Sequence, residues 1–208
     1  MKNEISQIML GTNKFLIDRK CVITLLIIAL FPSNSNVFAQ SAKGIYLTVN
    51  DFINNKIEFN TSENKNCKIK LHAFSFNSKI KIVKNDRVFR LNKDSIYGYV
   101  DWQGLPIRFY NKKTYTILFA NAHLVLYKQL VKPQSKYSEA LYTYHFSTDA
   151  GSFIFPLTIK NLESSFNYNP EFLKLLEGYF KSEKELIEYD QIHNTYKLIR
   201  LLQLSKIE

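Results

Sequence analysis

The sequence contains few cysteines, glycines and prolines: two, six and five among 208 residues. So few cysteines exclude a small domain held together by disulfides, and so few glycines exclude a collagen-like chain. Hydrophobic residues make up 46% of the sequence. That fraction is enough to form a core, so a wholly disordered chain is also excluded. The length suits one domain, or two small ones.

Sequence motifs of the common catalytic chemistries are missing as well. The chain has no P-loop, no GxGxxG fingerprint and no GxSxG nucleophile elbow. None of its four histidines lies three or four residues from another, so it has no HxxxH or HExxH zinc-binding pair. We therefore expect no metal site and no cofactor, and we identify no catalytic residue.

Residues 1–39 have the pattern of a secretory signal peptide. Basic residues precede the apolar run 21–31, which is too short to span a bilayer, and Ala39 suits a cleavage site before Gln40. We predict an exported protein that is periplasmic, outer-membrane-associated or secreted, and that meets the membrane only through this transient segment. An internal buried helix and an uncleaved membrane anchor are the alternatives, and Met9 is a second candidate start.

The chain beyond residue 39 is basic, with 24 Lys and Arg against 16 Asp and Glu, a net charge of +8. Only four of these basic residues are arginines, which bidentate contacts to phosphates and bases favour, so we predict no nucleic-acid partner. The densest basic stretch, 79–90, alternates lysine with isoleucine, as the outer face of a strand does. We interpret it as a solvated face; an anionic partner such as an envelope polysaccharide is the alternative.

An alternating pattern predicts β-structure over residues 44–157. Apolar and polar residues alternate from Cys67 onward, and strand-like runs recur roughly every 8–12 residues. Turns are predicted at Asn85-Asp86, at Gly104 and at 111–113. This spacing favours an antiparallel β-meander that curls into a barrel-like sheet.

The spacing of apolar residues changes at Thr158 and predicts C-terminal α-helices over 158–206. Thr158 can cap a first helix, and Asn169-Pro170 has the N-cap and N1 residues of a second. Ser182 with Glu185 predicts a capping box for a last helix. Along it, a spacing of three to four residues links Tyr189, Ile192, Tyr196, Ile199 and Gln203. We therefore expect a single α+β domain over residues 40–208.

Aromatic residues are the one enriched class, at 14% of the sequence. The only tryptophan lies in a predicted turn between tyrosines, and such a group can stack on a sugar or a peptide. The candidate ligand-binding residues are Trp102, Tyr97, Tyr99 and Tyr110. The alternative is that tyrosine and phenylalanine fill the core of the sheet, with Trp102 as a lid.

A few residues are candidates for chemistry. Four acids flank predicted strands, as the carboxylate pair of a glycoside hydrolase would. These are Asp94, Asp101, Glu139 and Asp149. Cys67 opens a strand, which favours a buried thiol over a reactive one. His145 stands on a strand between Tyr144 and Phe146, which indicates a structural histidine rather than a base.

Three segments of the chain resemble a family of uncharacterised secreted proteins of Bacteroidota. They are GIYLTVNDF (44–52), DSIYGYVDWQGLPIRF (94–109) and FPLTIKNLESSFNYNPEF (155–172). The resemblance implies an exported protein of one domain and no known activity. We expect a non-enzymatic binding module of the cell envelope or secreted space with a protein or glycan partner. The alternative is a secreted hydrolase that acts on polysaccharide through loop carboxylates.

Overall fold

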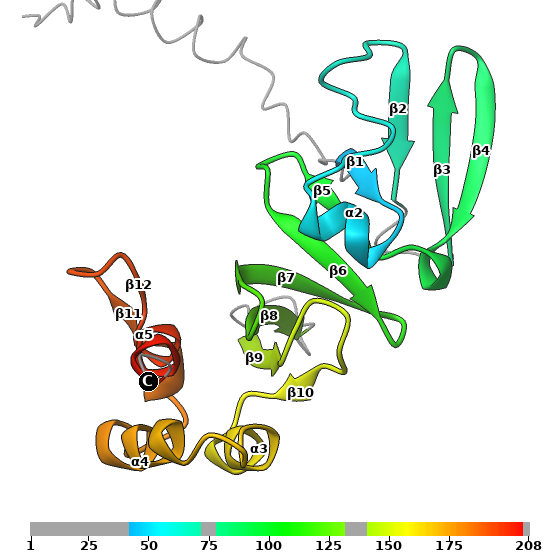
Figure 1. The fold of residues 1–208 in the computed structure, drawn as a ribbon. Coiled ribbons are helices and arrows are strands. Elements are labelled where there is room, and N and C mark those ends of the chain that lie inside the picture. The colour runs from blue at the N-terminus through cyan, green and yellow to red at the C-terminus, as the bar shows by residue number, and fades with distance from the viewer. Residues whose placement is uncertain (1–41, 72–77, 132–140, 206–208) are drawn as a thin grey trace, which may run out of the picture. The chain divides into compact units, whose positions relative to one another are not determined.

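A computed structural model describes residues 42–71, 78–131 and 141–205 of the chain (Figure 1). The described residues form antiparallel β-sheets followed by C-terminal helices, so the predicted α+β class is confirmed. The predicted signal peptide (1–39) and Glu139 lie outside the described residues, and the predictions made for them stay predictions.

The larger sheet has seven antiparallel strands in the order β1-β5-β6-β7-β8-β9-β10. Their bounds are β1 (Ala42–Tyr46), β5 (Gly98–Asp101), β6 (Pro106–Tyr110), β7 (Lys113–Ala120), β8 (Val125–Val131), β9 (Leu141–Ser147) and β10 (Phe155–Pro156). From β5 to β10 each strand pairs with the next one along the chain, which is the predicted meander. The sheet is open, with β1 and β10 at its edges, so the described strands form no closed barrel.

A second sheet of three strands is inserted between β1 and β5, which the sequence analysis did not separate from the first. It consists of β2 (Cys67–Lys70), β3 (Lys79–Lys84) and β4 (Arg87–Asn92). The short helix α2 (Val49–Ile53) lies between β1 and β2 in the chain, and the 3-10 turn η1 (Lys93–Ser95) leads from β4 to β5.

The three predicted strand turns are confirmed. Asn85 and Asp86 have φ values of 48° and 63°, the backbone of a type I′ hairpin turn, and they join β3 to β4. Asn111 and Lys112 have φ values of 47° and 61° and join β6 to β7. Gly104, with a φ of 90°, supplies the left-handed residue of the β5–β6 turn.

The first two predicted helix starts are also confirmed. Thr158 caps α3 (Ile159–Ser165), and its side chain accepts a hydrogen bond from the Asn161 N–H. Asn169 caps α4 (Pro170–Tyr179) and accepts from the Phe172 N–H, with Pro170 at the first helical position.

The prediction of one last helix from Ser182 is wrong. Ser182 does donate to Glu185, at 2.9 Å, but this pair belongs to the 3-10 turn η2 (Glu185–Ile187). A small hairpin follows, with strands β11 (Tyr189–Asp190) and β12 (Thr195–Tyr196), and helix α5 (Lys197–Leu204) begins only after it. The hairpin turn needs the left-handed backbone of Asn194, at a φ of 51°, which no helix contains.

Three hydrophobic clusters hold these elements together. One joins the C-terminal helices to β8 and β9, with Phe146, Phe166 and Phe172 fully buried. The second packs the three-stranded sheet against β1 and β5. The third contains the tyrosines Tyr46, Tyr97, Tyr115 and Tyr127 together with Val100, Ile117, Val125 and Ala150. This tyrosine-rich cluster contains the first candidate site.

Candidate functional site

The structure divides the four aromatic residues that the sequence suggested for ligand binding. Tyr97 and Tyr99 are buried, and they belong to two different clusters. Trp102 is 48% exposed in the β5–β6 turn, and Tyr110 is half-buried at the end of β6. The four residues therefore do not form one exposed surface. Tyr97 and Tyr110 do come together, around Arg108.

Arg108 is a buried cation enclosed by tyrosine rings. It is not among the ligand-binding residues predicted from the sequence. Its side chain is 5% exposed. The guanidinium carbon lies 5.2 Å from the ring centres of both Tyr97 and Tyr110, and 5.9 Å from that of Tyr127. These distances are those of cation–π contacts. The available signal was alternation, because Arg108 and Tyr110 are two residues apart on one face of β6.

Hydrogen bonds anchor the guanidinium in this cage. Its Nη1 donates to the Tyr127 hydroxyl at 2.8 Å, and Nη2 donates to the carbonyls of Gly151 and Ser152 at 3.3 and 3.0 Å. The Tyr127 hydroxyl lies 2.9 Å from the Ser147 hydroxyl, which donates to the Asp149 carbonyl at 2.6 Å. Tyr127 therefore donates to Ser147, and one chain of hydrogen bonds links β6, β8 and the loop after β9.

The carboxylate of Asp149 lies close enough to Arg108 for their charges to interact. No direct ion pair joins Arg108 to a carboxylate among the described residues, but its charge contributes to lowering the pKa of Asp149. The main cause of that lower pKa is the hydrogen bond from the Ser152 hydroxyl, with further bonds from the Gly151 and Ser152 N–H groups. Burial, with a contribution from the nearby Tyr127 hydroxyl, raises the pKa of Tyr97. The Tyr97 hydroxyl has no hydrogen-bond partner in the described ranges.

This cluster is suited to holding groups in place rather than to proton transfer. A guanidinium stays protonated in proteins, and the raised pKa keeps Tyr97 neutral. The ring of Tyr110 has two neighbours in the cluster, Arg108 at 5.2 Å and the Tyr115 ring at 6.4 Å. Tyr110 is thus a positioned aromatic side chain at the edge of the buried cluster.

A half-open pocket of about 320 Å³ lies beside Tyr110 at the β6–β7 turn. Its lining residues are Lys93, Asp94, Phe109, Tyr110, Asn111 and Lys112. The first two come from η1, and the others from β6 and its turn. Burial lowers the pKa of Lys93. The volume is at the lower end of small-ligand sites, and the walls offer two ammonium groups, one carboxylate, one amide and two aromatic rings.

The loop acids proposed for hydrolysis are partly used by their own turns. One carboxylate oxygen of Asp101 accepts from the N–H groups of Gln103 and Leu105, at 2.9 and 2.8 Å. Asp149 is bonded in the same way to its own loop. Asp94 lines the pocket and Glu139 lies outside the described residues. Two of the four acids therefore have a structural role.

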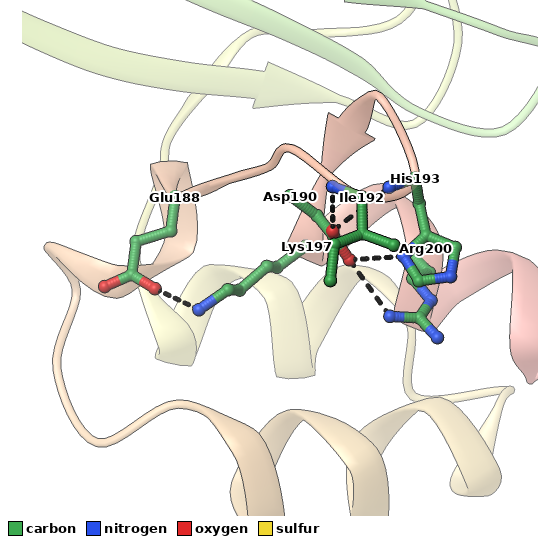
Figure 2. A network of polar contacts seen from close by, with 6 residues as sticks. All are labelled: Glu188, Asp190, Ile192, His193, Lys197 and Arg200. Atoms are coloured by element: carbon green, nitrogen blue, oxygen red, sulfur yellow. Dashed lines mark hydrogen bonds and ion pairs between the residues drawn. The ribbon is translucent and has the colours of Figure 1, made fainter.

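A second polar network ties the β11–β12 hairpin to α5, and Figure 2 shows Asp190 at its centre. One oxygen of Asp190 accepts from His193 Nδ1 at 2.8 Å and from Arg200 Nη1 at 2.9 Å. Burial raises the pKa of Asp190, but hydrogen bonds and charge from His193 and Arg200 outweigh it and lower the pKa to about 2. Lys197 pairs with Glu188 beside this network.

An imidazole oriented by a carboxylate is also the arrangement of a general base. Here His193 is 43% exposed, and it has no hydrogen bond to a hydroxyl or thiol in the part of the chain that the structure describes. The network therefore has the features of a structural tie between the hairpin and α5.

Of the remaining candidates for chemistry, Cys67 is buried and His145 is half-buried. Cys67 is 4% exposed and its Sγ donates to the Phe59 carbonyl at 3.5 Å, which confirms the predicted buried thiol. Burial raises its pKa, so the thiolate is disfavoured. Burial and the charge of Lys113 lower the pKa of His145, whose ring contacts Tyr115 edge-on at 5.1 Å. The Nδ1 atom of His145 is buried and has no hydrogen-bond partner among the described residues, so the hydrogen-bonding capacity of this ring is not fully used.

Within the described ranges, no group of three or more His, Cys, Asp or Glu side chains is arranged to hold a metal ion. The same residues include no helix that is long and apolar enough to cross a membrane.

No protein-family model, no curated protein and no solved structure matches this chain. The geometry described above is therefore the basis for a functional proposal.

Proposed function

We propose that the chain is an exported, non-enzymatic binding module that takes a small carboxylated ligand, such as an acidic sugar, in the pocket at the β6–β7 turn. The observation that carries the proposal is the position of Tyr110. Tyr110 lines the pocket, and its ring contacts the buried Arg108.

A fixed aromatic ring favours binding because little side-chain freedom is lost when the ligand arrives. Tyr110 contacts Arg108 and the edge-on ring of Tyr115, and hydrogen bonds fix Arg108 to three backbone or hydroxyl oxygens. The ring of a sugar can stack on such a face, as aromatic residues commonly do at recognition sites.

The charged groups of the pocket favour an anionic ligand. Lys93 and Lys112 give the walls two positive charges, against one negative charge from Asp94. Ammonium groups donate to carboxylate oxygens, while Asn111 and Asp94 can bond to sugar hydroxyls. Asp101 and Asp149 accept hydrogen bonds within their own turns, which favours binding over hydrolysis.

The proposal of export rests on residues 1–39, where basic residues precede a short apolar run and a small residue stands at the expected cleavage position. Detection of a secreted or periplasmic form that begins at Gln40 would support it. A cytosolic form that keeps residues 1–39 would contradict it.

The binding proposal is tested by an NMR titration of the folded chain with sodium glucuronate, with glucose as the uncharged control. We expect amide shifts centred on residues 93–94 and 109–112 with glucuronate, and weaker ones with glucose. Tyr110→Ala should abolish these shifts, whereas Tyr168→Ala, at a tyrosine that is 68% exposed elsewhere, should leave them unchanged. Shifts that avoid the pocket, or cleavage products from a polysaccharide panel, would contradict the proposal.

A further inference from the structure

The outer face of the three-stranded sheet carries a row of like charges. Residues directly opposite each other in antiparallel strands lie on the same face of a sheet. Lys70 of β2 is opposite Lys81 of β3, and Lys81 is opposite Arg90 of β4. Three cations from three different strands therefore stand in one line across the sheet.

Two more lysines share this face by alternation: Lys68 lies two residues from Lys70, and Lys79 two residues from Lys81. We call the set the cationic face: Lys68, Lys70, Lys79, Lys81 and Arg90. The opposite face of the same strands is buried, with Ile69, Ile80 and Ile82 in the core. β2, β3 and β4 contain no Asp or Glu.

No ion pair with a carboxylate among the described residues neutralises the row of Lys70, Lys81 and Arg90. Two lysines elsewhere have ion pairs, Lys56 with Glu58 and Lys197 with Glu188. By contrast Lys70, Lys81 and Arg90 have no ion pair among the described residues. Like-charged side chains directly opposite on neighbouring strands, with Cβ atoms about 5 Å apart, destabilise a sheet, and a bound anion would relieve that repulsion.

Protection of a sheet edge can account for Lys70 and Arg90, which lie on the edge strands β2 and β4, but not for Lys81. Lysine on an edge strand discourages pairing with another chain. In this sheet, however, the order is β2-β3-β4, so Lys81 lies on the central strand, where no edge needs protection. The positive charge of Lys81 is therefore not needed to protect the sheet from pairing with another chain.

We propose that the cationic face binds a linear acidic polysaccharide, whose chain crosses the strands along the row from Lys70 through Lys81 to Arg90. This inference is separate from the pocket at the β6–β7 turn and can hold if that pocket binds nothing.

The composition of the face favours this partner over other polyanions. Four of its five cations are lysines, which act as point charges on flexible stems and suit a regular series of carboxylates better than bidentate phosphate recognition. The other residues that alternation places on this face are Val83, Val88 and Asn92. The described face thus lacks aromatic rings for stacking bases and the Trp or Tyr anchors of most protein interfaces, and its apolar side chains, Val83 and the exposed Val88, offer little area for entering a lipid surface.

The test measures binding of polygalacturonate to the full chain and to two triple variants with the same loss of charge. The first is Lys70→Gln/Lys81→Gln/Arg90→Gln. The control replaces three exposed lysines of the helical region, Lys160, Lys174 and Lys184, by Gln. We expect the first variant to bind about tenfold or more weakly and with a smaller salt dependence, and the control to bind within about twofold of the unchanged protein.

Several results would overturn the proposal. They are the absence of polygalacturonate binding to the unchanged protein, equal losses in both triple variants, and tighter binding to a single-stranded oligonucleotide or to phosphatidylglycerol vesicles than to polygalacturonate. The first variant should unfold at an equal or higher urea concentration, since it removes repulsion, so misfolding would be detected directly. Tyr110→Ala should keep full polygalacturonate affinity, which separates this test from that of the pocket.

Discussion

The guanidinium of Arg108 on β6 donates a hydrogen bond to the Tyr127 hydroxyl on β8 at 2.8 Å, across the intervening strand β7. The tie joins two strands that share no backbone hydrogen bonds. Because both groups are buried, removing either one leaves the other without its partner in a region that excludes water.

The first prediction follows from this tie. Arg108→Met should lower the free energy of unfolding by about 3 kcal/mol, because the Tyr127 hydroxyl and two loop carbonyls lose the hydrogen bonds that Arg108 donates to them. Arg87→Met, at an exposed position of β4, should change it by less than about 0.5 kcal/mol. Urea denaturation of both variants measures the difference. Equal unfolding midpoints would contradict the role assigned to Arg108.

The second prediction compares two glycines. A Cβ added at Gly98 would overlap the carbonyl oxygen of Ile107 on the paired strand, so Gly98→Ala should destabilise the fold by about 1–3 kcal/mol. A Cβ at Gly178 in α4 meets no atom within 4 Å, so Gly178→Ala should stabilise by about 0.5–1 kcal/mol. Thermal unfolding of the two variants checks the opposite signs. A stabilised Gly98→Ala variant would show that β5 does not approach β6 this closely.

The third prediction concerns acid stability. The pKa of Asp190 falls from its ordinary value of 3.8 to about 2 in the folded protein. A carboxyl whose pKa is depressed stabilises the fold above its unfolded pKa, and this contribution is lost as the pH falls through the folded value. The melting temperature should therefore drop between about pH 4 and pH 2, and Asp190→Asn should reduce that drop.

The matched control for this pH series is Asp86→Asn, in the exposed β3–β4 turn, which should leave the slope unchanged. If both variants reproduced the pH dependence of the unchanged protein, the network around Asp190 would not contribute to stability. Hydrogen bonds from His193 and Arg200 would then have to be absent in solution.

The fourth prediction concerns Cys67. Because its thiol is buried and its pKa is raised by burial, native protein should react with a thiol reagent far more slowly than protein in concentrated urea. Mass spectrometry of peptides assigns the label to Cys67 rather than to Cys21. Labelling of Cys67 at the same rate in the native and unfolded protein would contradict the buried position.

Much of the fold could be predicted because its signals are local. Asn169 and Pro170 mark a helix start by their own chemistry, and Asn85 with Asp86 fits a turn that needs two left-handed residues. The hairpin at 189–196 could not be predicted this way. Its two-residue strands are too short for a period of two, and Ile192, at 89% exposure, only happens to fit the helical spacing.

The candidate site was predicted in part. Tyr110 lines the pocket, and Tyr97 lies against the same guanidinium, but Tyr99 belongs to another cluster. Tyr97 precedes β5, which begins at Gly98, so strand alternation does not place its side chain beside that of Tyr99. Arg108 was missed because a lone arginine in a strand is expected to face solvent. Its burial depends on tyrosines from other parts of the chain, such as Tyr97 and Tyr127, which the local sequence does not indicate. Register between distant strands, which also aligns Lys70, Lys81 and Arg90, is not a local property of sequence.

The pairing of β1 with β5 has a consequence for the order of folding. The whole three-stranded sheet lies between these two strands in the chain, so their pairing closes a long loop, whereas β5 to β9 are joined by short connections. Loop-closure entropy delays such distant contacts, and the N-terminal edge strand should therefore be the last to dock. The strand β1 begins only a few residues after the proposed leader. Export machinery that binds the leader would therefore also keep β1 from pairing with β5. The sheet would then be completed only once the chain is released.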